Sequence, residues 1–159
     1  MKKMFIIAAA ALSMISMAAC SGNKCGKDGN ERADELYTGI LPAADADGIR
    51  YSLKLDYDDD HNDTEGDYDL TESYLVADST ATTGFRDDKT YTSEGDFKVV
   101  AKNGKKYIVL SKDAKDSNAN ATSSLAFEVT SDSTLLMVNE NTFEAPADST
   151  ALNYTLRLQ

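Results

Sequence analysis

Hydrophobic and polar residues alternate strictly along positions 49–57. The odd-numbered positions carry apolar or aromatic side chains, and the even-numbered positions carry polar or charged ones. A period of two, with one β-branched residue and two tyrosines on the apolar side, predicts a strand with one buried face. A shorter apolar strand starts at Tyr37, and Pro42 and Gly48 mark the break between the two strands.

The same period returns further along the chain. Residues 68–74 alternate again after a polar, acidic connection, which predicts a long hairpin with the strand at 49–57. Asn103-Gly104 lies between two apolar runs, and this pair favours a tight type I′ hairpin turn. We expect the Thr-rich stretch 77–92 to form a loop with short strands. The remaining strands are expected near 97–101, 107–110, 125–129, 135–138 and 152–158.

About eight strands are therefore expected, nearly all joined to their sequence neighbours. Beyond the N-terminal segment, the pattern predicts no helix of ten or more residues. A single meandering sheet of this size protects its edges by closing on itself. The sequence predicts an all-β fold, a small antiparallel meander barrel.

The N-terminus reads as a targeting segment. A pair of lysines precedes an apolar run that ends in small residues, which predicts a secretory signal peptide over residues 1–19. The run ends in Met-Ala-Ala-Cys, the form of a bacterial lipobox, so we expect cleavage before Cys20 and acylation of its sulfur, which would hold the protein on a membrane. Residues 20–36 lack periodicity and are expected to form a flexible tether, with residues 37–159 as the folded domain.

The chain is strongly acidic. It has 16 Lys and Arg side chains against 27 Asp and Glu, a net charge of −11. Removal of residues 1–19 takes away two lysines, which leaves 14 basic against 27 acidic side chains, or −13. Such a chain repels phosphate backbones, so we expect no nucleic-acid partner. With Cys20 acylated, Cys25 would be the remaining thiol, and no intramolecular disulfide is expected.

Two short stretches resemble a known family. Gly-Ile-Leu-Pro at 39–42 and Ala-Asp-Ala-Asp-Gly-Ile at 44–49 are similar to the N-terminal domain of the NlpE lipoproteins, a family associated with copper resistance and envelope stress. The resemblance implies a lipocalin-like barrel and a place in the cell envelope, and Ser21 agrees with sorting to the outer membrane. In that family a Cys-x-x-Cys pair usually follows the proline, whereas this chain has Ala43 and Ala46.

Glu72 is the candidate site residue inside the expected barrel. It shares its parity with Tyr68, Leu70 and Tyr74, so a regular strand points it inward. A carboxylate there needs hydrogen-bond donors, such as a tyrosine hydroxyl or an arginine. Glu72, with Tyr51 and Tyr74, would mark the polar end of a ligand cavity. The alternatives are a purely structural hydrogen bond or a β-bulge that turns Glu72 outward.

Metal, cofactor and catalytic chemistry find little support. Cys25, His61 and Met137 lie in separate segments, without the convergence that a copper or zinc site needs. The acidic loop 56–67 resembles a calcium loop but has His61 where that motif requires glycine. Neither a nucleophile elbow nor a Gly-rich phosphate loop is present. We expect no metal, no cofactor and no enzymatic activity.

Three functions remain open. The first is a monomeric envelope lipoprotein, anchored at Cys20, that acts as a sensing or interaction module with an envelope protein partner, as the resemblance implies. The second is a carrier that holds a small apolar ligand inside a lipocalin-like barrel, with a large apolar cavity as its mark. The third, direct metal binding, conflicts with Ala43 and Ala46.

Overall fold

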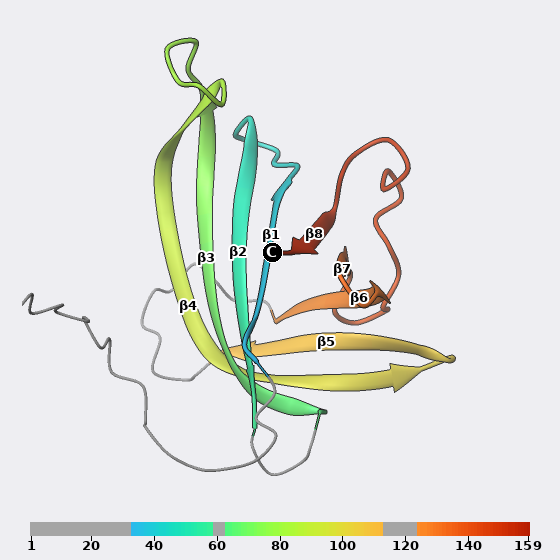
Figure 1. Cartoon of the computed structure of the whole chain (residues 1–159). Helices are drawn as coiled ribbons and strands as arrows, with labels where there is room; N and C mark the ends of the chain where they lie inside the picture. The colour runs from blue at the N-terminus through green and yellow to red at the C-terminus, as the bar shows by residue number, and fades with distance from the viewer. Residues whose placement is uncertain (1–32, 59–62, 113–123) are drawn as a thin grey trace, which may run out of the picture. The chain divides into compact units, whose positions relative to one another are not determined.

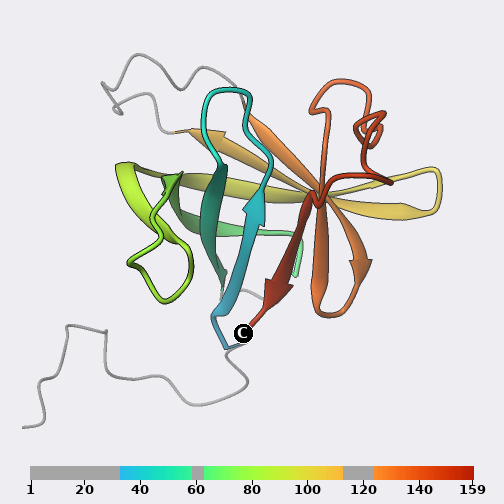
Figure 2. The same cartoon turned by 90° about the horizontal axis from the view of Figure 1, so that it is seen from above.

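Eight antiparallel strands close into one barrel, in which each strand pairs with its sequence neighbours and β1 pairs with β8. This arrangement confirms the predicted all-β meander barrel. Viewed from above, β1 lies between β2 and β8, which completes the closure (Figure 2). The strands are β1 (Glu35–Leu41), β2 (Gly48–Tyr57), β3 (Glu65–Ala77), β4 (Phe85–Lys102), β5 (Lys105–Lys112), β6 (Leu125–Ser131), β7 (Thr134–Val138) and β8 (Thr155–Leu158).

The computed structural model describes residues 33–58, 63–112 and 124–159. The predicted signal peptide, Cys20, Cys25 and His61 lie outside these ranges, so the expectations for them stay predictions. In the described part of the chain no helix is long and apolar enough to cross a membrane.

The first three strands follow the alternation in the sequence. β2 pairs with β3 along its whole length, from Gly48 opposite Leu75 to Tyr57 opposite Gly66. The odd-numbered side chains of β2 face the interior, where Leu53 and Leu55 are fully buried. Hydrophobic period two therefore predicted both the strands and their inner faces.

The stretch 77–92 differs from its prediction. Only residues 78–84 form a loop, and β4 then runs without interruption from Phe85 to Lys102, beside β3 (Figure 1). The first half of β4 is exposed on both faces, so its side chains carry no hydrophobic period that a sequence pattern could detect. A β-bulge in the pairing with β3 falls between Tyr74 and Leu75.

The β4–β5 connection confirms the predicted turn. Asn103 and Gly104 have positive φ angles of 52° and 77°, and Lys102 lies opposite Lys105. Only a residue that tolerates the left-handed region fits here at low cost, which the Asn-Gly pair provides. The last strand is shorter than predicted: β8 starts at Thr155, and Leu152 lies in the preceding loop with an exposed side chain.

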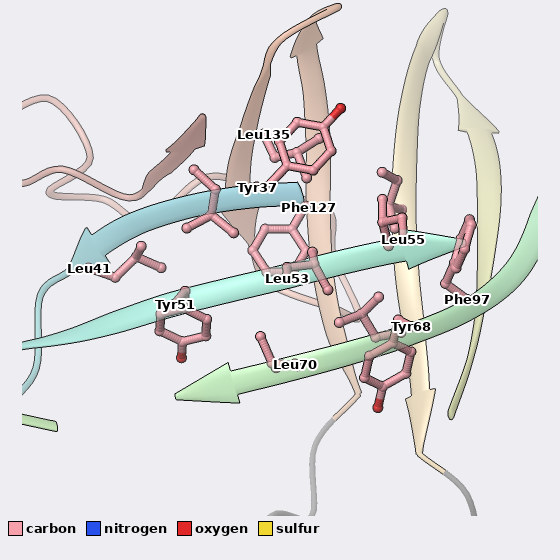
Figure 3. Packing of buried hydrophobic residues seen from close by; sticks show 13 residues of the cluster. Tyr37, Leu41, Tyr51, Leu53, Leu55, Tyr68, Leu70, Phe97, Phe127 and Leu135 are labelled. Carbon is pink, nitrogen blue, oxygen red and sulfur yellow. The ribbon is translucent and has the colours of Figure 1, made fainter. Parts of the chain in front are cut away.

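One apolar cluster fills the interior. Phe97 and Phe127 are fully buried, and Tyr57 packs its ring edge-on against Phe97 with 4.9 Å between the ring centres. Gly66 lies opposite both Tyr57 and Phe97, and any side chain there would collide with them. Figure 3 shows the cluster between the strands. Its buried members are Tyr37, Leu41, Tyr51, Leu53, Leu55, Tyr68, Leu70, Phe97, Ile108, Leu110, Phe127, Leu135 and Leu156.

Candidate functional site

Three neighbouring strands bring polar side chains together on the inner face. Tyr51 of β2 lies directly opposite Glu72 of β3, which lies directly opposite Tyr91 of β4. Tyr74 lies two residues beyond Glu72, opposite Ile49. The three residues predicted from the sequence, Tyr51, Glu72 and Tyr74, are therefore neighbours on one face. The β-bulge comes after Tyr74 and leaves Glu72 facing inward.

Glu72 finds its partner in a tyrosine rather than in an arginine. Burial of Tyr51 raises the pKa of its hydroxyl, and the charge of Glu72 and a hydrogen bond to Glu72 raise it further. Tyr51 thus stays protonated and donates to the Glu72 carboxylate. Two candidate arginine partners contact other residues: Arg50 lies 2.7 Å from Asp87, and Arg86 lies 4.0 Å from Asp88. A protonated tyrosine that donates to a carboxylate supplies hydrogen bonding and no nucleophile.

Two residues of this cluster were missed in the sequence. The ring of Tyr91 packs edge-on against Tyr74, with 5.7 Å between ring centres, and is 47% exposed. Ser93 is only 7% exposed, and its Oγ has no hydrogen-bond partner. Both share the parity of Phe97 on β4, so period two extended backwards from Phe97 would have placed them on the inner face.

The hollow that the structure shows lies elsewhere, on the outer face of β2, β3 and β4. It has a volume of about 330 Å³. Its charged side chains occupy the positions of each strand that point away from the barrel interior. Asp56 of β2 is paired with Asp67 of β3, and Asp67 is paired with Asp96 of β4. Burial raises the pKa of Asp56, and the neighbouring charge of Asp34 adds to the shift. The lining residues are Lys54, Asp56, Asp67, Tyr68, Asp69, Glu94, Gly95 and Asp96. This acidic hollow lacks the apolar lining and the Glu72 end expected of a carrier's cavity.

Comparison with protein families identifies the barrel. The family model of the NlpE N-terminal domain matches residues 37–148, which cover most of β1, all of β2 to β7 and more than two thirds of the chain. This chain belongs to the NlpE N-terminal domain family. NlpE proteins are envelope lipoproteins, and the N-terminal domain of this family is a module of the envelope-stress and copper-resistance type. No curated protein and no solved structure matches the chain.

The copper chemistry associated with the NlpE family has no ligands in the loop after Pro42. Ala43 and Ala46 provide no donor atom at the family's cysteine positions. Asp47 is engaged in holding the loop, because its carboxylate accepts a hydrogen bond of 2.6 Å from the backbone N–H of Ala77. In residues 33–58, 63–112 and 124–159, no group of three His, Cys, Asp or Glu side chains is placed to hold a metal ion. The residues of this loop therefore do not fit a copper site.

Proposed function

We propose that this protein is a lipid-anchored envelope lipoprotein whose barrel acts as a sensing and interaction module in envelope stress. The observation that carries the proposal is the NlpE family match, which extends over most of the barrel. The interior supports it, because large side chains such as Phe97 and Phe127 fill the space that a carrier would need.

The anchor would be Cys20, which ends a signal peptide of lipobox form. Ser21 favours the outer membrane, and the polar tether up to β1 would separate the barrel from the bilayer. A signalling role of this kind requires a surface that a partner protein recognises. A catalytic centre is not required, and no enzymatic activity is proposed.

Direct copper binding is not part of the proposal, since Ala43 and Ala46 replace the family's cysteines. A copper-linked phenotype would instead be reached through the stress response. Native mass spectrometry of the full chain after addition of Cu(I), Cu(II) and Zn(II) tests this point. We expect the metal-free mass throughout, and a stoichiometric copper adduct would contradict it. An organic ligand that copurifies would favour the carrier instead.

The proposed function is tested by overproducing the full chain in a bacterium that carries an envelope-stress reporter, with labelled palmitate in the medium. We expect label in the membrane-bound protein and a rise in reporter activity. Cys20→Ala should lose the label and the membrane attachment, whereas the matched variant Cys25→Ala should keep both. Absence of label from the unmodified protein, or a reporter that does not respond to it, would overturn the proposal.

A further inference from the structure

Strand β4 is longer than its neighbour β5. It pairs with β3 from Phe85 to Lys98 but with β5 only from Gly95 to Lys102. Within the described ranges, residues 85–94 of β4 therefore pair on one side only, along the outer edge of the extended sheet in Figure 1. An unpaired edge presents backbone donors and acceptors that can pair with another strand.

The direction of these backbone groups follows from two fixed points. The N–H of Val99 donates to Thr64 O at 2.7 Å, on the β3 side. Because these groups alternate along a strand, the backbone N–H and C=O groups of odd-numbered β4 residues point to β3, and those of even-numbered residues point to the other side. The two-residue turn agrees with this, since Lys102 pairs with Lys105 and so directs its backbone groups to β5. Thr90, Thr92 and Glu94 consequently present their N–H and C=O groups to the open edge.

The length of the regular edge is limited by the β-bulge opposite Tyr74 and Leu75, where Asp88 has no counterpart on β3. Bulges bend a strand and terminate regular pairing. The usable edge is therefore positions 89–94, which suits a short extended segment. On its inner face lie the exposed ring of Tyr91 and the buried, unpartnered Oγ of Ser93.

The negative charge beside this edge determines which kind of segment can bind there. Glu94 and Asp96 of β4, with Asp67 and Asp69 of β3, line the outer hollow of about 330 Å³ directly beside the end of the edge. Side chains of an added strand would alternate between the two faces, so every second one would point toward these carboxylates. Lysine or arginine at those positions is complementary, whereas a second copy of this chain would bring a net charge of −11.

We propose that an extended segment of a partner protein, with lysine or arginine at alternate positions, adds to the sheet as a strand along positions 89–94 of β4. Its basic side chains reach Glu94 and Asp96, and its backbone pairs with Thr90 and Thr92. Its inward side chains pack on the exposed ring of Tyr91. In strand addition of this kind, backbone hydrogen bonds supply affinity, and the contacts of alternate side chains supply specificity. It rests on the interaction role proposed above and names the kind of partner.

The test uses the full chain in a mild nonionic detergent and a fluorescent peptide, Val-Lys-Val-Lys-Val-Lys-Val, blocked at both ends. Fluorescence anisotropy should show saturable binding that weakens as salt is added. The same peptide with glutamate in place of lysine, and a lysine peptide N-methylated at every residue so that neither edge can pair, should not bind. Equal binding of the N-methylated peptide would overturn strand addition.

Two pairs of variants separate the backbone from the charge. Thr92→Pro removes one outward N–H while leaving the odd-numbered pairing to β3 intact, so the affinity should fall about tenfold. Thr92→Ala keeps that N–H and should bind within about twofold of the unaltered chain. Glu94→Gln should weaken binding several-fold, whereas Asp132→Asn, in the β6–β7 turn, changes the net charge equally and should not.

The outcomes distinguish this inference from the function on which it rests. If Thr92→Pro binds the peptide as well as Thr92→Ala does, the β4 edge is not the site. If the full chain self-associates with rising concentration and Thr92→Pro abolishes this, a second copy occupies the edge and the basic partner is wrong. In both cases palmitate labelling and the stress reporter can still succeed, because neither measurement depends on Thr92.

Discussion

The two ends of the barrel interior are built from different kinds of side chain. At one end, Phe97, Phe127 and Leu55 pack with no exposure to solvent, and β4 and β5 close the wall. At the other end, Tyr51 and Glu72 form a polar pair, and β4 continues alone beside β3. One strand, β4, thus contributes the buried Phe97 where it pairs with β5 over residues 95–102, and has an open edge at residues 85–94.

This difference separates stability from recognition. The apolar end gains its free energy from burial of large side chains, roughly 25 cal/mol per Å² of apolar surface. At the polar end the buried Tyr51 donates to the half-buried Glu72, and the buried Ser93 hydroxyl has no partner. The polar end contributes little to the core, so it can leave backbone groups of β4 unpaired without a large loss of stability. A protein partner would bind at these unpaired groups.

The largest effect is expected at the apolar end. Phe127→Ala removes a fully buried ring from the cluster and should lower the free energy of unfolding by about 3–5 kcal/mol. Urea denaturation monitored by circular dichroism measures this value. Tyr91→Ala, at the other end, removes a ring that is 47% exposed and should cost far less. Equal losses in the two variants would show that the ends do not differ in this way.

The second effect concerns the Tyr51–Glu72 pair. Tyr51→Phe removes the donor and leaves the Glu72 carboxylate inside the barrel without it, at a cost of about 1–3 kcal/mol in unfolding free energy. The double variant Tyr51→Phe with Glu72→Leu removes both partners and should recover part of this loss. If the double variant is no more stable than the sum of the two single changes predicts, the pair is not coupled as described.

Local chemistry made much of the fold predictable from the sequence. The φ angles required by the turn at Asn103-Gly104 depend on two adjacent residues, so the hairpin could be read directly. The buried faces of β2 and β3 follow from a period of two within each strand. The inward direction of Glu72 needed only its parity with Leu70.

What could not be predicted depends on contacts between distant segments. The first half of β4 lacks a hydrophobic period because both of its faces meet solvent, and its strand form depends on pairing with β3. The pairing of Glu72 with Tyr51 requires the register of β2 against β3, which no single strand encodes. The positions of Tyr91 and Ser93 beside Glu72 depend on the register of β4 against β3, so the sequence pattern gives at most the face on which these two residues lie.

A smaller effect is expected at Ser93. Because its buried Oγ has no partner, Ser93→Ala should leave the free energy of unfolding unchanged or raise it by up to about 1 kcal/mol. Ser73→Ala is the matched control, since Ser73 is equally buried but its Oγ lies 3.0 Å from the Thr90 hydroxyl. The control should lose about 0.5–1.5 kcal/mol. A loss at Ser93 as large as that at Ser73 would indicate a partner for Ser93 in the free protein.

The smallest effect is a pH dependence from the outer hollow. Burial and the charge of Asp34 raise the pKa of Asp56 above its ordinary value of 3.8, so folding favours the protonated carboxyl. The stabilising contribution of Asp56 is therefore complete below about pH 3.8 and is lost as the pH rises through the folded-state pKa. Asp56→Asn should accordingly be more stable than the unaltered chain at pH 7, by less than about 1 kcal/mol, and the difference should vanish at low pH.

Asp78 provides the opposite case for the same measurement. Hydrogen bonds from the hydroxyl and backbone N–H of Thr80 lower the pKa of Asp78, so folding favours its charged form. Its stabilisation is present above the ordinary pKa of 3.8 and is lost as the pH falls through the folded-state pKa. Melting temperatures between pH 3 and 7 should thus rise for Asp56→Asn and fall for Asp78→Asn as the pH increases, relative to the unaltered chain. Parallel curves would mean that neither burial nor the charge of Asp34 shifts the pKa of Asp56 in the folded chain, and that the hydrogen bonds from Thr80 do not shift the pKa of Asp78.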